Sequence, residues 1–130
     1  MPVSERTGLP PTRPAIALLT DVACVLVFCT IGRRSHSEGL TLTGIAETAW
    51  PFITGTVAGW LAARAYPGDF KPSAIYPTGL IVWASTVIIG MLLRKATSAG
   101  TAPSFIVVAT LTTAALLIGW RAVAAAVARR

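Results

Sequence analysis

The segment from Pro14 to Ile31 constrains the fold of this chain more than any other stretch. It is an apolar run, long enough to cross a hydrocarbon core of about 30 Å, and Asp21 is its one charged residue. An ionisable group at membrane depth is energetically costly, so Asp21 is a candidate functional residue by default. The segment therefore predicts a transmembrane helix that must accommodate a buried acid.

The composition places the whole chain in the same class of protein. Of its 130 residues, 54% are hydrophobic and 12% are charged, and the mean hydropathy is +0.69. Soluble domains carry roughly a quarter charged residues, so this chain has too little polar surface for a soluble monomer. The net charge of +6 comes largely from cations at the ends of apolar runs, where they suit lipid headgroups. They form no stripe of the kind that binds nucleic acid, which is not an expected partner.

Three further apolar runs follow the first, with short polar or turn-rich connections between them. Thr43 is the expected N-cap of the second run. The pattern predicts an all-α integral membrane four-helix bundle with up-down-up-down order. The expected parts are a disordered tail over 1–13 and a four-helix transmembrane domain over 14–130, with helices at about 14–31, 43–66, 78–93 and 103–127.

An internal repeat is one interpretation of the spacing. A shift of about 60 residues places Gly59-Trp60 on Gly119-Trp120 and Arg34 on Arg94. Two duplicated helical hairpins would produce this match, as in parallel membrane repeats. The alternative is coincidence, because Trp and Arg are common near the ends of membrane helices.

Up-down order puts both termini on one side of the cell membrane. The cations on that side are Arg6, Arg13, Arg64, Lys71, Arg121, Arg129 and Arg130, and those on the other side are Arg33, Arg34, Arg94 and Lys95. Seven against four favours cytoplasmic termini by the positive-inside rule, although the margin is five against four without Arg64 and Arg121.

Asp21, Arg64 and Arg121 are expected at similar depth and form a candidate buried charge cluster. One interpretation is an ion pair from Asp21 to Arg121 or Arg64 that fixes helix packing. The other is a carboxylate in a water-accessible cavity that couples to a proton or cation.

A second candidate cluster lies at the opposite membrane face. Arginine pairs with phosphate and carboxylate groups, and histidine changes charge near neutral pH. The cluster is therefore a candidate anion, headgroup or pH-sensing site, formed by Arg33, Arg34, His36, Glu47 and Arg94. The simpler alternatives are a solvated loop histidine and a glutamate that only stabilises the start of a helix.

Small residues predict where the helices pack closely. Gly55 and Gly59 are spaced by four, and Gly79 and Gly90 share one face of the third helix. The four tryptophans are interpreted as interfacial anchors. Cys24 and Cys29 fall on different helix faces and are expected to pack as small apolar residues. We expect no metal site and no cofactor, and no catalytic motif indicates an enzyme.

A set of residues between Asp21 and Arg121 has a characteristic order. It includes Gly32-Arg33 with Ser35-His36, Pro51-Phe52, Gly59-Trp60 and the closing Gly119-Trp120-Arg121. In this order the chain resembles a family of small four-helix membrane proteins of unknown function found in actinobacteria and haloarchaea. The resemblance implies a four-helix membrane protein and transfers no activity.

Two functional hypotheses remain. The first is a non-catalytic membrane component that packs with or supports a membrane complex, or binds lipid. The alternative is a small proton- or cation-coupled transporter that uses Asp21, similar in layout to small multidrug transporters. In either case the expected partners are the lipid bilayer and a second copy of the chain or a larger membrane complex.

Overall fold

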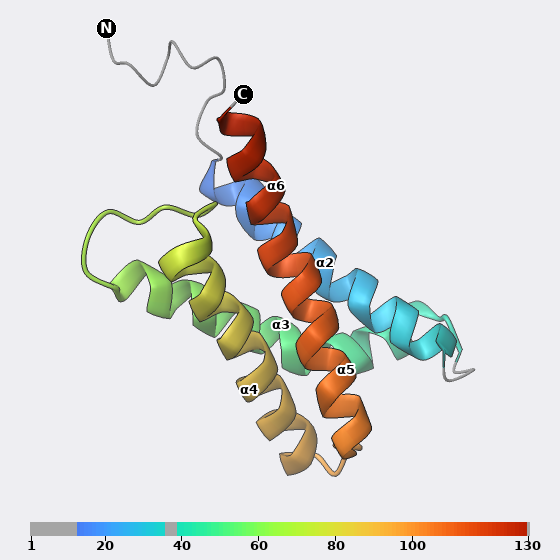
Figure 1. Ribbon diagram of the computed structural model, residues 1–130. Coiled ribbons are helices and arrows are strands. Elements are labelled where there is room, and N and C mark those ends of the chain that lie inside the picture. Colours follow the sequence, from blue (N-terminus) through green and yellow to red (C-terminus); the bar gives the residue numbers. More distant parts are fainter. Residues whose placement is uncertain (1–12, 36–38, 130) are drawn as a thin grey trace, which may run out of the picture.

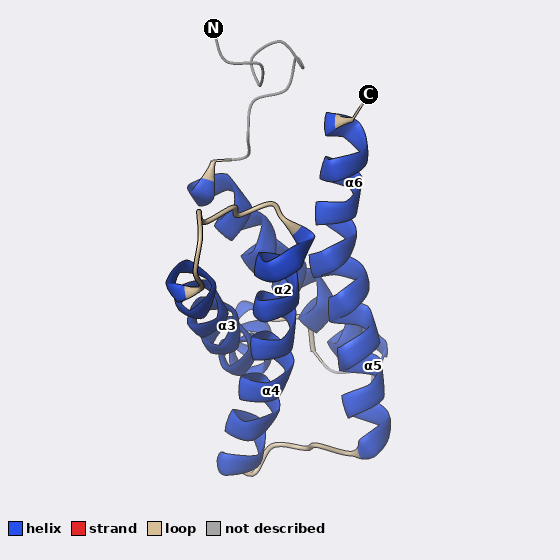
Figure 2. Ribbon diagram, turned by 60° about the vertical axis from the view of Figure 1, so that its left-hand side comes forward, coloured by secondary structure: helices blue, strands red, loops and turns tan. Residues whose placement is uncertain are grey.

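The computed structural model describes residues 13–35 and 39–129, which form helices and connections with no strand among them (Figure 2). The elements are α2 (Pro14–Ser35), α3 (Leu42–Ala65), α4 (Leu80–Ala96), α5 (Pro103–Thr113) and α6 (Gly119–Ala128). A single π-helical turn, η2 (Ala114–Ile118), joins α5 to α6, so these three form one long helix (Figure 1). The chain enters α4 through the segment Ile75–Gly79, in which Tyr76 has an extended backbone. The fold is thus all-helical, with four helices in the described part of the chain.

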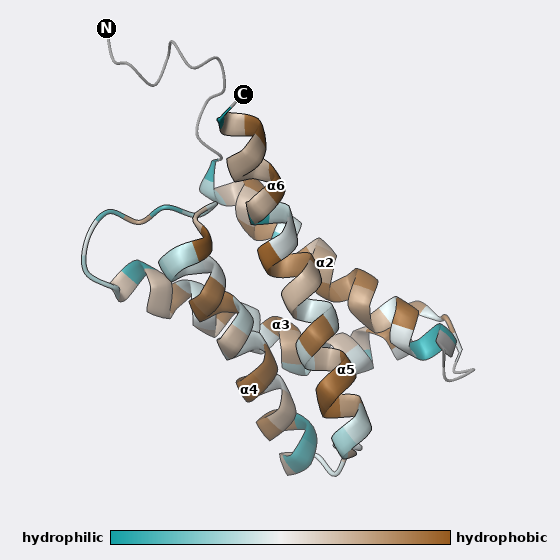
Figure 3. Cartoon of the chain, in the orientation of Figure 1, coloured by the Kyte–Doolittle hydropathy of each residue, from teal (hydrophilic) through white to brown (hydrophobic). Residues whose placement is uncertain are grey.

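Three of the four helices are long and apolar enough to cross a membrane. These segments are Pro14–Arg34, Ile75–Ala96 and Pro103–Ala128. Helix α3 has a comparable length but a less apolar composition and does not qualify on the same criterion. Large apolar side chains such as Leu19, Leu92 and Leu111 face outward, whereas strongly hydrophilic residues lie at the ends of α2 and α4 (Figure 3). This distribution is the one a lipid-facing helix requires.

Helix α3 begins at a polar cap two residues before the expected position. The side chain of Thr41, not Thr43, accepts a hydrogen bond from the backbone N–H of Gly44, at 3.0 Å. The helix then continues without interruption through Pro51, which is buried. Both Gly44 and Pro51 therefore lie within a single helix of 24 residues.

Helices α3 and α4 pack closely, because glycines on α3 let the backbone of α4 approach. A Cβ atom on Gly55 would lie 2.6 Å from the carbonyl oxygen of Ser85, and one on Gly59 would lie 2.9 Å from the Cα of Val82. The buried hydroxyls of Thr56 and Thr86 are hydrogen bonded across the same contact, at 2.8 Å. The small residues thus let a polar link form between two closely packed helices.

Two apolar clusters fill the interior. The first surrounds the rings of Phe28, Phe52 and Phe105, which come from three different helices and pack edge-on or stacked. Gly90 makes room for this cluster, because a Cβ atom there would collide with the ring of Phe52. The second cluster lies around Ala17, Trp60 and Val82 and is flanked by Trp120. Each cluster borders one of the two charged regions described below.

Candidate functional site

Asp21 on α2 and Arg121 on α6 form an ion pair inside the helical bundle. The two terminal nitrogens of the Arg121 guanidinium donate to the two carboxylate oxygens of Asp21, at 2.8 and 2.7 Å. Both side chains are 0% exposed. This is the bidentate arrangement in which arginine binds a carboxylate most strongly.

Two tryptophans complete the hydrogen bonding of the carboxylate. The indole N–H of Trp60 on α3 donates to Oδ2 of Asp21 at 2.8 Å, and that of Trp120 on α6 donates to Oδ1 at 2.9 Å. Each carboxylate oxygen therefore accepts two hydrogen bonds. Trp60 is only 7% exposed and Trp120 is half-buried. Because both indole N–H groups bind the buried carboxylate, the interpretation of these two tryptophans as interfacial anchors is wrong. Trp83 is also engaged inside the bundle, where it donates to the carbonyl oxygen of Thr110 at 3.0 Å.

The remaining donors of Arg121 are directed to backbone carbonyls. Its Nε–H donates to the carbonyl of Pro72 at 3.1 Å, and one terminal nitrogen also donates to that of Leu117 at 3.0 Å. The guanidinium lies over the ring of Trp120, 4.6 Å from its centroid. Among the described residues, no buried side-chain nitrogen or oxygen lacks a hydrogen-bond partner. The charges of the pair are thus fully compensated, which burial of an ion pair requires.

Local backbone features make room for this arrangement. A Cβ atom on Gly79 would lie 2.9 Å from Cδ of Arg121, so only glycine leaves space for the arginine stem. The π-helical turn η2 precedes Arg121, and its carbonyls accept from side chains, Leu117 from Arg121 and Leu116 from the thiol of Cys24 at 3.7 Å. Single π-helical turns inside α-helices are frequent at functional sites.

Arg64 lies outside this cluster. It is exposed in the last turn of α3, where its guanidinium lies over the ring of Phe70 at 5.3 Å from the centroid. The Asp21 carboxylate is therefore paired with Arg121, and Arg64 is a surface residue near the end of its helix. Among the described residues, no three His, Cys, Asp or Glu side chains gather into a group that could hold a metal ion.

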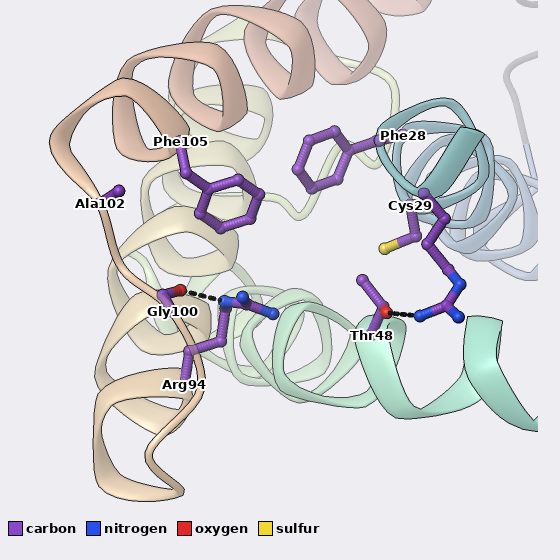
Figure 4. Close-up of a pocket in the computed structure, with 9 residues that line it drawn as sticks. Phe28, Cys29, Thr48, Arg94, Gly100, Ala102 and Phe105 are labelled. Carbon is purple, nitrogen blue, oxygen red and sulfur yellow. Dashed lines mark hydrogen bonds between the residues drawn. The ribbon is translucent and has the colours of Figure 1, made fainter. Parts of the chain in front are cut away.

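The second candidate cluster is only partly assembled. Arg33 and Arg94 line one cavity of about 220 Å³ at the opposite end of the bundle (Figure 4). Arg34 and Glu47 are exposed and are not part of its lining. His36, the proposed pH sensor, lies outside the described residues. Arg33 of α2 and Arg94 of α4 thus line the same cavity, whereas Arg34 and Glu47 do not.

The two cavity arginines are held in the same way. The Nε–H of Arg33 donates to the carbonyl of Gly39 at 2.7 Å, and that of Arg94 donates to the carbonyl of Gly100 at 2.8 Å. In each case the glycine follows six residues after the arginine, in the connection to the next helix. Arg33 also donates to the hydroxyl of Thr48 at 3.0 Å, and Arg94 lies over the ring of Phe105 at 4.6 Å.

A repeated dipeptide in the sequence indicates the two tryptophans that bind the Asp21 carboxylate. Gly59-Trp60 and Gly119-Trp120 are the same dipeptide in two helices, and an arginine follows each, Arg64 four residues after Trp60 and Arg121 directly after Trp120. That pattern places both indoles at the same end of the bundle as Asp21. Their hydrogen bonds to a single carboxylate could have been inferred from depth, as the pairing with arginine was.

Comparison with known proteins gives a family and no activity. No curated protein and no solved structure was found to match the chain. A family described as "Protein of unknown function (DUF3054)" matches residues 18–124, which include the ion pair, both tryptophans and both cavity arginines. The chain belongs to this family of proteins of unknown function.

Proposed function

We propose that this protein is a non-catalytic, multi-pass component of the cell membrane that supports a membrane complex or binds lipid. All four helices cross the bilayer in up-down-up-down order, with α3 as the most polar and best covered of them. Three apolar helices of sufficient length support this assignment. The burial of nine α3 residues, among them Gly55, Gly59 and Trp60, supports the crossing of the fourth, because one face of α3 packs inside the helical bundle.

The observation that carries the proposal is the saturation of Asp21. A carboxylate that carries protons or cations must exchange its partners during each cycle and must be reached by water. Asp21 is 0% exposed, and each of its oxygens already accepts two hydrogen bonds. The arrangement suits a brace between helices, and it leaves the transporter alternative without its main support.

Duplication of one helical hairpin is part of the proposal. Arg33 with Gly39 and Arg94 with Gly100 form the same turn after the first helix of each hairpin. Trp60 and Trp120, near the end of each second helix, donate to the two oxygens of one carboxylate. Two hairpins related by an axis along the membrane normal account for both similarities.

Orientation and partners complete the proposal. Both termini lie in the cytoplasm, as the greater number of cations on that side favours. The many outward-facing apolar side chains are suited to lipid, to a second copy of the chain or to a larger membrane complex.

Reconstitution into liposomes tests the proposal. Wild-type protein, Asp21→Asn and the matched surface variant Asp69→Asn are compared for proton flux under an imposed pH gradient and membrane potential. Asp69 is exposed in the connection after α3, so its variant controls for the substitution itself. The proposal predicts that liposomes with wild-type protein or with Asp69→Asn are no more permeable to protons than liposomes without protein. Wild-type flux that a correctly folded Asp21→Asn variant abolishes would establish the transporter instead.

A further inference from the structure

We propose that an open apolar cavity between the start of α2 and the end of α3 holds one acyl chain of an anionic phospholipid, and that Arg64 at its rim binds the lipid phosphate. This site rests on the proposed function, because it requires the membrane location proposed above. The cavity has a volume of about 300 Å³. Trp60 forms part of its wall and also donates to Asp21, so the cavity lies beside the buried ion pair.

The walls of this cavity are apolar, and one side is open. Ala15 and Leu18 line it from α2, and Val57 and Leu61 line it from α3. Val57 is 45% exposed and Leu61 is 66% exposed, so the cavity opens on the outer surface of the bundle. The α2 wall belongs to a segment that is long and apolar enough to cross a membrane. In a bilayer, the open side of the cavity therefore meets hydrocarbon.

The size of the cavity favours an acyl chain over a helix of a second copy. Apolar cavities of about 150 Å³ hold a benzene molecule, so a cavity of this volume has room for a segment of one hydrocarbon chain. An α-helix with its side chains is about 10–12 Å wide and would rest on the rim without filling the space. The occupant that matches both the volume and the apolar walls is a single chain.

The charge at the rim favours an anionic headgroup. Among the described residues that line the cavity, Arg64 alone is charged, and no carboxylate is present. Arg13 lies directly before Pro14, another lining residue, and is exposed. Two exposed cations thus flank one apolar cavity, a charge distribution complementary to the phosphate of a phospholipid.

The depth of these cations matches the headgroup level. Arg13 directly precedes the membrane-crossing segment that begins at Pro14, and Arg64 lies in the last turn of α3. Basic residues at such positions meet the phosphates of a bilayer. Val57 lies seven residues before Arg64, which is about 10 Å along the helix at 1.5 Å per residue. An acyl chain would therefore run from the phosphate at Arg64 past Leu61 toward the hydrocarbon core.

Phe70 holds the Arg64 side chain near the cavity. The Arg64 guanidinium lies over the ring of Phe70, 5.3 Å from its centroid, and the same ring packs edge-on against Trp60. Contact with a ring face does not use the N–H groups in the plane of the guanidinium, which can donate to a phosphate in pairs. Because Trp60 also binds Asp21, a lipid in the cavity covers the wall that braces the carboxylate.

Lipid titration with detection by native mass spectrometry tests the site. The full chain in detergent is titrated with phosphatidylglycerol and, separately, with phosphatidylcholine, which has no net charge and should bind more weakly. Arg64→Gln should weaken phosphatidylglycerol binding by about tenfold, the loss expected for one charge-assisted contact. Ala15→Leu keeps the charge but fills the cavity, and should weaken binding similarly. Equal binding of the two lipids to the wild type would overturn the preference for an anionic headgroup.

Matched controls make the same changes outside the cavity. Arg129→Gln removes an exposed cation after the end of α6, and Ala62→Leu adds bulk at an exposed position of α3. Both should leave phosphatidylglycerol binding within about twofold of wild type. A loss in Arg129→Gln equal to that in Arg64→Gln would show general surface attraction and overturn the site. Unchanged binding in Ala15→Leu would overturn the placement of the acyl chain.

The same spectra report whether a second copy occupies the cavity instead. A wild-type dimer that Ala15→Leu abolishes and Ala62→Leu preserves, with no phosphatidylglycerol retained, would assign the cavity to a second copy and overturn the lipid.

Alkaline extraction of membranes distinguishes failure of this site from failure of the proposed function. It reports whether the chain is integral, independently of Arg64. A chain released by alkali contradicts the membrane proposal. A chain that stays in the membrane and binds phosphatidylglycerol equally in wild-type and Arg64→Gln forms contradicts only the lipid site.

Discussion

Arg121 contacts both carboxylate oxygens of Asp21 through two different nitrogens, although 100 residues separate them in the chain. The pair joins α2 to α6, and the indoles of Trp60 and Trp120 bind the same carboxylate. Breaking a buried pair leaves an uncompensated charge, and this costs more than the pair itself gains. The most sensitive point of the fold is therefore this carboxylate.

Asp21→Asn should strongly destabilise the protein. The amide keeps the shape of the carboxylate but leaves the Arg121 guanidinium buried without a counter-charge, at a cost of roughly 3–5 kcal/mol. Thermal unfolding in detergent or lipid measures the effect. Asp69→Asn, the same substitution at an exposed position, should change stability by less than about 0.5 kcal/mol. Equal effects of the two substitutions would contradict a bracing role for Asp21.

Trp60→Phe and Trp120→Phe should each destabilise the fold by about 1.5–3 kcal/mol, because each removes one hydrogen bond to a charged group. Trp50→Phe is the control, since Trp50 is 44% exposed. Chemical unfolding, monitored by the circular dichroism of the helices, gives the free energy of unfolding of each of the three variants. If Trp60→Phe and Trp120→Phe lower the stability no more than Trp50→Phe does, Trp60 and Trp120 do not brace the carboxylate and are better interpreted as interfacial anchors.

Gly55→Ala should be destabilising by about 1–3 kcal/mol, since the new methyl group would force α3 away from α4. Gly119→Ala is the opposite case. Gly119 is helical with nothing within 4 Å of a Cβ atom, so alanine should stabilise the helix by about 0.5–1 kcal/mol. The unfolding midpoints of both variants show whether Gly55→Ala lowers the stability and Gly119→Ala raises it. A stabilising Gly55→Ala would contradict the close approach of the two helices.

The hydroxyl of Tyr66 should ionise at a higher pH than that of an ordinary tyrosine. Its hydroxyl is hydrogen bonded to that of Tyr76 at 2.8 Å, and this bond raises the pKa of Tyr66 above its ordinary value of 10.0. Because the folded pKa is raised, the stabilisation is complete below about pH 10 and is lost as pH rises through the folded pKa. The chain has only 2 tyrosines, so phenolate absorbance reports on this pair alone.

Tyr76→Phe provides the comparison for that titration. It leaves Tyr66 as the single tyrosine and removes its hydrogen-bond partner, so the Tyr66 midpoint should fall toward that of an unfolded chain. A midpoint in Tyr76→Phe as high as that of the first ionisation in the wild type would show that the hydrogen bond does not control the pKa of Tyr66.

Much of the fold could be predicted from apolar runs and their connections. Helix starts were less predictable, because Thr41 and Thr43 are equally good caps by type and only backbone geometry selects Thr41. The choice of Arg121 over Arg64 as the partner of Asp21 also required the structure. It depends on Gly79 leaving space for the arginine stem and on the carbonyl of Pro72 accepting its Nε–H. Neither feature leaves a periodic pattern in the sequence.

The cavity at the other end shows a similar limit. Basic residues at the ends of two apolar runs predicted a candidate anion site, and Arg33 and Arg94 do line one cavity. The rings of Phe28 and Phe105 were not predicted as its walls, because they come from helices far apart in sequence. Residues brought together by packing of separate helices cannot be assigned to a site from spacing within one helix.

A double-mutant cycle on Asp21 and Arg121 tests the central claim most directly. Stabilities are measured for wild type, Asp21→Asn, Arg121→Gln and the double variant, all in the same lipid or detergent. A structural ion pair predicts that the double variant is less destabilised than the sum of the single variants, by about 2 kcal/mol. Single effects that add to within about 0.5 kcal/mol would show that the two side chains act independently, and would contradict the account.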